Sequence, residues 1–294
     1  MFVIFAKLSR VESASENTST GESPEVNQTS VYRPTPDNPP WNNPVAVAVW
    51  IASVLAILLV PMVFVLPYLI SNGVPFGDKQ ALGEFFQQDP VAIFLQLIAI
   101  IPAHILTIAV AWAVVTKQNR FSFRETLGWE SGGMKWRDYL GILVVFFAVV
   151  IVVGIYFPEQ ENEMTRILRS SRWAVFLIAF IATFTAPIVE EVIYRGILYS
   201  AFQRTLGVGA AVAAVTLLFA LVHVPQYYPS YSTIFLLVLL SLILTLVRAR
   251  TGNLLPCIVL HTVFNATQSI LLILEPYLNT PNPVIEPVTS LILK

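Results

Sequence analysis

Two glutamates and an arginine interrupt the apolar stretch IVEEVIYRGIL at residues 188–198. A charged side chain in a membrane-inserted helix costs about 2.5 to 3.5 kcal/mol, so Glu190, Glu191 and Arg195 indicate a function. Arg195 follows Glu191 by four residues, which places both on one helix face and allows an ion pair. Glu190 is turned about 100° away from that face, so its carboxylate is free for other chemistry.

Two further pairs of side chains stand at helical spacing in apolar stretches. Phe219 and His223 are four residues apart in FALVH, and His261 and Asn265 are four apart in HTVFN. Each pair therefore lies on one face of its helix. A single histidine in an apolar helix is more often a hydrogen-bonded core residue than a ligand. Because these groups occur on separate helices together with Glu190, we expect them to converge on one site.

A carboxylate, two imidazoles and an amide, with no serine or cysteine nucleophile beside them, can activate water. Glu190 can act as the general base, with an imidazole positioning or sharing the proton. His261 and Asn265 can donate to a developing oxyanion, which is worth a few kcal/mol in a dry site. This set of groups predicts hydrolysis of an amide bond.

Other intramembrane protease designs lack their essential residues in this sequence. A zinc protease of the H-E-x-x-H type is excluded because none of the three histidines begins that pattern. The single G-x-S, at residues 21–23, falls in a polar N-terminal region and not in a membrane helix, which argues against a serine protease. An aspartyl protease needs two membrane aspartates, and the four aspartates fall in the N-terminal region, in loops or at a helix end: Asp37, Asp78, Asp89 and Asp138.

The motifs EEVIYRG, FALVH and HTVFN, in this order, resemble the three-part signature of the CAAX protease and bacteriocin-processing family, which includes type II CAAX-prenyl endopeptidases. The resemblance covers about residues 173–275 and extends to the phrases TGNLLPCIVLH and FSFRETLGW. Tyr194 departs mildly from the family, which often has phenylalanine there. The resemblance implies an intramembrane endopeptidase but does not fix its substrate, which need not be a prenylated protein.

The resemblance also implies a role for each site residue. Glu190 would activate water together with His223, while His261 and Asn265 would form the oxyanion site. The supporting positions are Glu191, Arg195 and Phe219. The family has been described both as metalloprotease and as metal-independent glutamate protease. Zinc would be held by Glu190, His223 and His261 if present, but we expect no cofactor.

Composition predicts an all-α integral membrane protein. Of the 294 residues, 56% are hydrophobic and 12% charged, and the mean hydropathy is +0.71. Spanning a hydrocarbon core of about 30 Å takes roughly 20 apolar residues. We predict seven spans, with six or eight as alternatives, near residues 45–70, 91–115, 138–157, 172–199, 208–224, 233–247 and 254–274. Polar residues 1–43 are predicted to be a disordered tail, and residues 44–294 the transmembrane domain.

Charge distribution predicts orientation and partners. With seven spans, eleven Lys and Arg lie on the side of the N-terminus and five on the other, so the N-terminus is expected to be cytoplasmic. Net charge of -1 argues against a nucleic-acid partner. The expected partners are the lipid bilayer and a protein or peptide substrate, which lipidation could anchor. The expected depths of two site residues in the membrane disagree with a shared site. The predicted boundaries put His223 about 22 Å from the cytoplasmic side and Glu190 about 14 Å.

Two other functions fit parts of the pattern. Buried Glu, Arg and His also build the proton relays of proton-coupled transporters. Transporter folds commonly consist of two repeated halves, however, and the E-E-x-x-x-R pattern occurs only once in this sequence. A non-catalytic membrane scaffold or immunity protein is the second alternative, and the intact set of catalytic-type residues argues against it. His104, two residues after Pro102, is expected to cap or bridge a kinked helix.

Overall fold

The computed structural model describes residues 32–278 of the chain. The chain divides into residues 1–32 and a compact unit that begins at Arg33. Within the described residues this unit is built from helices, and its isolated bridge between Thr35 and Asn38 is the one extended pairing. The predicted all-α fold is therefore confirmed.

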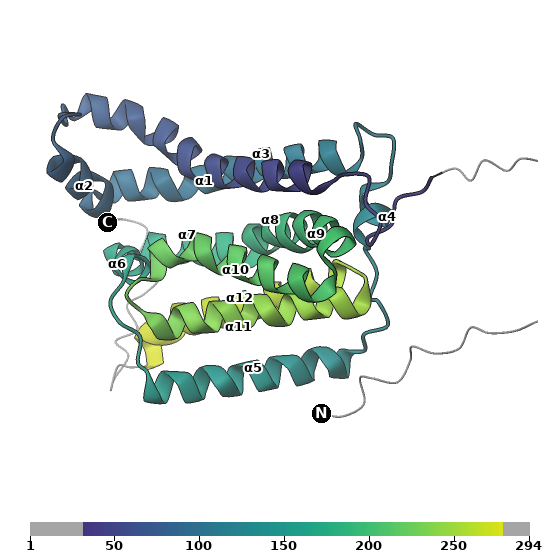
Figure 1. Ribbon diagram of the computed structural model, residues 1–294. Coiled ribbons are helices and arrows are strands. Elements are labelled where there is room, and N and C mark those ends of the chain that lie inside the picture. Colours follow the sequence, from purple (N-terminus) through teal and green to yellow (C-terminus); the bar gives the residue numbers. More distant parts are fainter. Residues whose placement is uncertain (1–31, 279–294) are drawn as a thin grey trace, which may run out of the picture. The chain divides into compact units, whose positions relative to one another are not determined.

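Seven helical stretches among the described residues are long and apolar enough to cross a membrane, as the sequence predicted. They are α1 (Asn43–Ser71), α3 (Pro90–Val115), α5 (Trp136–Tyr156), the run from α7 to α9 (Arg172–Leu206), α10 (Val208–Tyr227), α11 (Tyr231–Thr251) and α12 (Leu255–Leu278). Short helices in the connections are α2 (Lys79–Gln88), α4 (Phe123–Leu127) and α6 (Glu163–Ser170). Helix α1 packs along α3, α10 packs along α11, and α5 lies beside α11 and α12 (Figure 1).

The fourth span is a continuous helix whose hydrogen-bond register changes twice. Its parts are α7 (Arg172–Phe180), the π turn η1 (Ile181–Thr185), α8 (Ala186–Glu191), the π turn η2 (Val192–Leu198) and α9 (Tyr199–Leu206). A π turn bonds residue i to residue i+5, and such turns occur frequently at functional sites. The two adjacent glutamates end α8 and therefore lie between two changes of register.

The fourth span also continues further than the sequence predicted. Its predicted end was residue 199, but α9 carries the helix to Leu206. Glu190 is thus sixteen residues, about 24 Å, from this end, and His223 is fifteen residues, about 22 Å, from the start of α10. The depth difference between the two residues came from the misplaced boundary. Hydropathy ends the span early because Gln203 and Arg204 make the last two turns polar.

Residues 33–42 pack against the ends of the helices. Trp41 is 4% exposed, and its indole N–H donates to the Ile197 carbonyl of η2 at 3.1 Å. The buried guanidinium of Arg248, on α11, donates to the Asp37 carboxylate at 3.1 Å. One apolar anchor and one ion pair therefore attach this segment to the fourth and sixth spans.

Residues 33–42 belong to the predicted disordered tail, whereas in the structure they pack on the helices. The segment is rich in proline and asparagine and has little apolar surface of its own. Its order comes from Trp41 and from backbone carbonyls that accept hydrogen bonds from arginines on α9 and α11. Residues 1–31 of the predicted tail lie outside the described residues.

Replacing Trp41 tests whether this segment stabilises the fold. We expect Trp41→Ala to lower the free energy of unfolding by about 3 to 5 kcal/mol, the usual cost of removing a buried aromatic side chain. The measurement is the thermal unfolding midpoint of the purified protein in detergent. Trp136→Ala is the matched control, because Trp136 is 68% exposed and its loss should leave the midpoint nearly unchanged. Equal midpoints for the two variants would contradict the packing role.

Candidate active site

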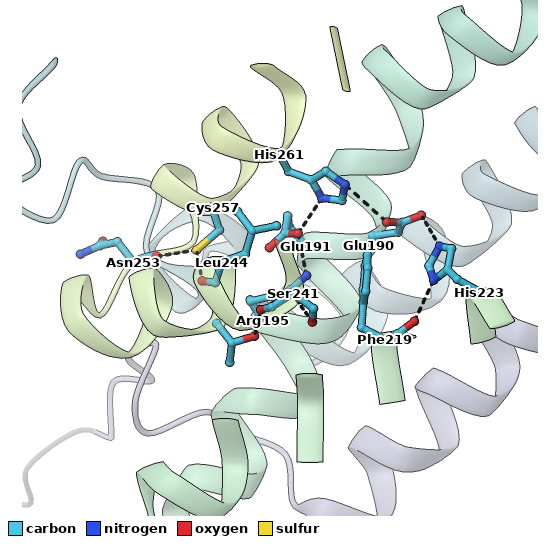
Figure 2. Close-up of polar contacts among 11 residues, drawn as sticks. Glu190, Glu191, Arg195, Phe219, His223, Ser241, Leu244, Asn253, Cys257 and His261 are labelled. Atoms are coloured by element: carbon cyan, nitrogen blue, oxygen red, sulfur yellow. Dashed lines mark hydrogen bonds and ion pairs between the residues drawn. The ribbon is translucent and has the colours of Figure 1, made fainter. Parts of the chain in front are cut away.

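Glu190 lies between two histidines that come from other spans (Figure 2). Its Oε1 is 3.9 Å from Nε2 of His223 on α10, and its Oε2 is 3.7 Å from Nε2 of His261 on α12. The side chains of Glu190 and His223 are 22% and 17% exposed, whereas that of His261 is 3% exposed. Three of the four residues predicted to be catalytic therefore meet, and their accessible side is that of His223.

The second glutamate belongs to a buried network. Arg195 Nη1 donates to Glu191 Oε1 at 2.8 Å, as their spacing predicted, and both side chains are 0% exposed. Arg195 also donates to two hydroxyls on α11, those of Ser241 at 2.8 Å and Thr245 at 3.2 Å. His261 Nδ1 lies 2.8 Å from the same Glu191 oxygen. The network thus joins the fourth, sixth and seventh spans.

These contacts determine which nitrogen of each histidine carries its proton. An ionised carboxylate only accepts, so His261 Nδ1 must donate to Glu191. His223 Nδ1 must likewise donate to the Phe219 carbonyl, 2.7 Å away. In the neutral rings both Nε2 atoms therefore carry a lone pair, and both face Glu190. Three hydrogen-bond acceptors converge at this point.

Phe219 packs against both imidazoles of the site. It is 1% exposed, and its ring lies 4.7 Å from the His223 ring and 6.1 Å from the His261 ring between centroids. The Arg195 guanidinium carbon lies 4.8 Å from the centre of the same ring, within the range of a cation–π contact. A single aromatic ring therefore packs against the Arg195 guanidinium of the ion pair and against both imidazoles.

Asn265 lies one helical turn after His261, and its amide donates to the Ala182 carbonyl at 2.8 Å. Ala182 is part of η1, where the next backbone donor in the π register would be residue 187. Pro187 has no N–H, so the Ala182 carbonyl needs another donor, and Asn265 supplies it. One N–H of the predicted oxyanion residue is thus committed to holding the π turn, and its second N–H is left for other partners.

Sequence reasoning missed the hydroxyls of Ser241 and Thr245. They are four residues apart on α11 and so share one face, but hydroxyls are common in membrane helices and gave no reason to single them out. The expected bridging role of His104 is present, since its Nδ1 lies 2.9 Å from the Thr185 hydroxyl in the fourth span.

The donors around Glu190 can be compared with those of a zinc site. Zinc binds His nitrogen at about 2.0 to 2.1 Å in tetrahedral geometry. Among the described residues, no three His, Cys, Asp or Glu side chains are grouped so that they could hold a metal ion.

The seven long apolar helices define an integral, multi-pass membrane protein, and one segment of it is similar to an intramembrane protease family of CAAX type. The family model described as type II CAAX prenyl endopeptidase Rce1-like matches residues 172–267, about a third of the chain. This segment runs from α7 into α12 and contains all seven site and supporting residues predicted from the motifs. The match confirms the predicted family resemblance. Comparisons with curated proteins and with solved structures gave no match.

Removing one partner of the buried ion pair should destabilise the protein strongly. Arg195→Gln leaves the Glu191 charge uncompensated, and we expect a loss of about 3 to 5 kcal/mol in the free energy of unfolding. The thermal unfolding midpoint in detergent measures this loss. The double variant Glu191→Gln with Arg195→Gln should recover part of it, because no isolated charge remains. A single variant as stable as the wild type would show that the pair does not support the fold.

Proposed function

We propose that the protein is an intramembrane endopeptidase in which Glu190 activates a water molecule. The observation that carries the proposal is the convergence of three acceptors, with His223 Nε2 and His261 Nε2 at 3.9 and 3.7 Å from the Glu190 oxygens. Such distances are too long for direct hydrogen bonds. One water molecule that lies about 2.8 Å from a Glu190 oxygen and from a histidine Nε2 can donate a hydrogen bond to each of these two atoms and so bridge them.

In the proposed reaction the water donates one hydrogen bond to Glu190 and the other to His223 Nε2, and it keeps the proton that faces His223. Its oxygen attacks the carbonyl carbon of the substrate amide, and Glu190 takes up the proton as the new O–C bond forms. The protonated carboxyl group then delivers this proton to the amide nitrogen as the C–N bond breaks. The products are a carboxylic acid and an amine, and Glu190 returns to its ionised form.

His261 and Asn265 are proposed to stabilise the oxyanion. Because His261 Nδ1–H is bonded to Glu191, Nε2 of the neutral ring is an acceptor before the reaction, and it would donate to the oxyanion only after the ring takes up a proton during the reaction. Asn265 would contribute the amide N–H that is not bonded to Ala182.

The substrate is proposed to be a membrane-associated protein or peptide. The reacting groups lie within spans, and Glu190 and His223 are the more exposed of them, so the peptide would approach from the side of α10. The description of the matched family makes a prenylated C-terminal peptide the first candidate to test. A cytoplasmic N-terminus remains part of the proposal, on the distribution of Lys and Arg.

Replacing Glu190 tests the mechanism. We expect Glu190→Gln to lower peptide hydrolysis by about 10²- to 10⁴-fold, the usual contribution of general acid–base catalysis, without changing the unfolding midpoint. Purified protein in liposomes would be assayed against a library of peptides with and without a prenyl group. Glu275→Gln, which changes an exposed carboxylate near the end of α12, is the matched control and should keep full activity. Equal hydrolysis by wild type and Glu190→Gln would end the protease proposal.

Chelation separates the glutamate mechanism from a zinc mechanism. We expect dialysis of the purified protein against a zinc chelator to leave the hydrolysis rate unchanged, because Glu190 and two imidazoles suffice to activate water. The zinc content of the active protein would be measured in parallel. Loss of activity on chelation, restored by added zinc, would instead assign Glu190, His223 and His261 as ligands.

A further inference from the structure

The third histidine of the chain contacts the same helix as the other two. His104 lies on α3 and is 7% exposed. Its Nδ1 is 2.9 Å from the Thr185 hydroxyl, and the charge of Glu190 interacts electrostatically with its ring. All three histidines of the sequence therefore lie around α8, although His104 is about 70 residues before the segment that matches the family model.

The direction of the hydrogen bond follows from the other contact of Thr185. The Thr185 hydroxyl donates to the Ile181 carbonyl at 3.2 Å, and this carbonyl also accepts from the Ala186 N–H in the π register of η1. Its oxygen must then accept from His104 Nδ1–H. Because a buried hydroxyl that loses a partner carries a desolvation penalty, the His104 ring and the Thr185 side chain hold each other in place.

Thr185 connects the His104 hydrogen bond to the helix that carries Glu190. It is the last residue of η1 and the N-cap position of α8, where its side chain makes no capping bond. Glu190 is the fifth residue of α8, about one turn further on. On the opposite side, Asn265 of α12 donates to the Ala182 carbonyl. The π turn that precedes the catalytic-type glutamate is thus held from two spans, by His104 through Thr185 and by Asn265.

We infer that His104 is a positioning residue, which fixes η1 through Thr185 and so sets where the Glu190 carboxylate points. The inference rests on the proposed function of Glu190. Without the His104 contact, η1 loses its support from α3, and the carboxylate can move relative to His223 and His261. Displacement of a reacting group by about 1 Å can cost 10²-fold in rate, so this loss should appear in kcat.

Three variants of the full chain in liposomes test the inference. His104→Leu removes the donor and should lower kcat for peptide hydrolysis by about 10- to 100-fold while KM stays within about twofold. His104→Asn places an amide near the position of Nδ1 and should restore kcat to within about threefold of the wild type. Thr107→Val, one turn later on α3, removes a buried hydroxyl that has no hydrogen-bond partner among the described residues and should leave kcat unchanged.

The inference is overturned if His104→Leu keeps the kcat of the wild type, or if His104→Asn is as slow as His104→Leu. A readout that needs no catalysis keeps it separate from the proposed function. Amide hydrogen exchange of residues 181–191 should be faster in His104→Leu than in the wild type or in Thr107→Val. Inactive wild-type protein would refute the proposed function, while unchanged exchange in His104→Leu would refute the support of η1 by His104.

Discussion

A buried ion pair is the interaction on which the site depends. Glu191 and Arg195 are both completely buried, and either charge alone would cost several kcal/mol in the low-dielectric interior of the bundle. Ser241 and Thr245 accept further hydrogen bonds from Arg195, and His261 donates to the Glu191 oxygen that Arg195 also bonds. Satisfying two charges therefore brings α11 and α12 against the fourth span, and the orientation of His261 follows from this requirement.

The two adjacent glutamates have different roles because the helix separates their directions. Glu191 faces the interior of the bundle and is neutralised, while Glu190 faces the imidazoles and keeps partial access to solvent. The π turns on both sides of α8 are part of the same arrangement. Pro187 removes a backbone donor, Asn265 of α12 bonds the Ala182 carbonyl, and His104 of α3 contacts the Thr185 hydroxyl of η1. The irregular helix thus leaves a backbone carbonyl free to bond with a side chain, whereas a regular α-helix would bond that carbonyl to its own N–H groups.

Much of this arrangement could be predicted from the sequence, because it depends on helical periodicity and on the positions of charged residues in apolar stretches. Apolar stretches gave the seven spans, and spacing by four gave the Glu191–Arg195 pair. The remaining features depend on tertiary contacts. The end of α9 is polar and is stabilised by residues 33–42, which are polar as well. Hydropathy therefore predicted neither the full length of α9 nor the order of residues 33–42. The contact of Asn265 with Ala182 requires the π register, which spacing rules for a regular α-helix do not contain.

The proton positions on the two histidines have a consequence for inhibitors. With Nδ1 of each ring occupied, the groups that face one another are a carboxylate and two lone pairs. A carboxylate group would present further acceptors and would be repelled by this arrangement before the reaction. A compound with an amidine or protonated amine at the cleavage position would instead place N–H donors and positive charge among these groups. Under the proposed mechanism, a hydrophobic compound that carries such a cationic group is therefore the first chemical probe to test.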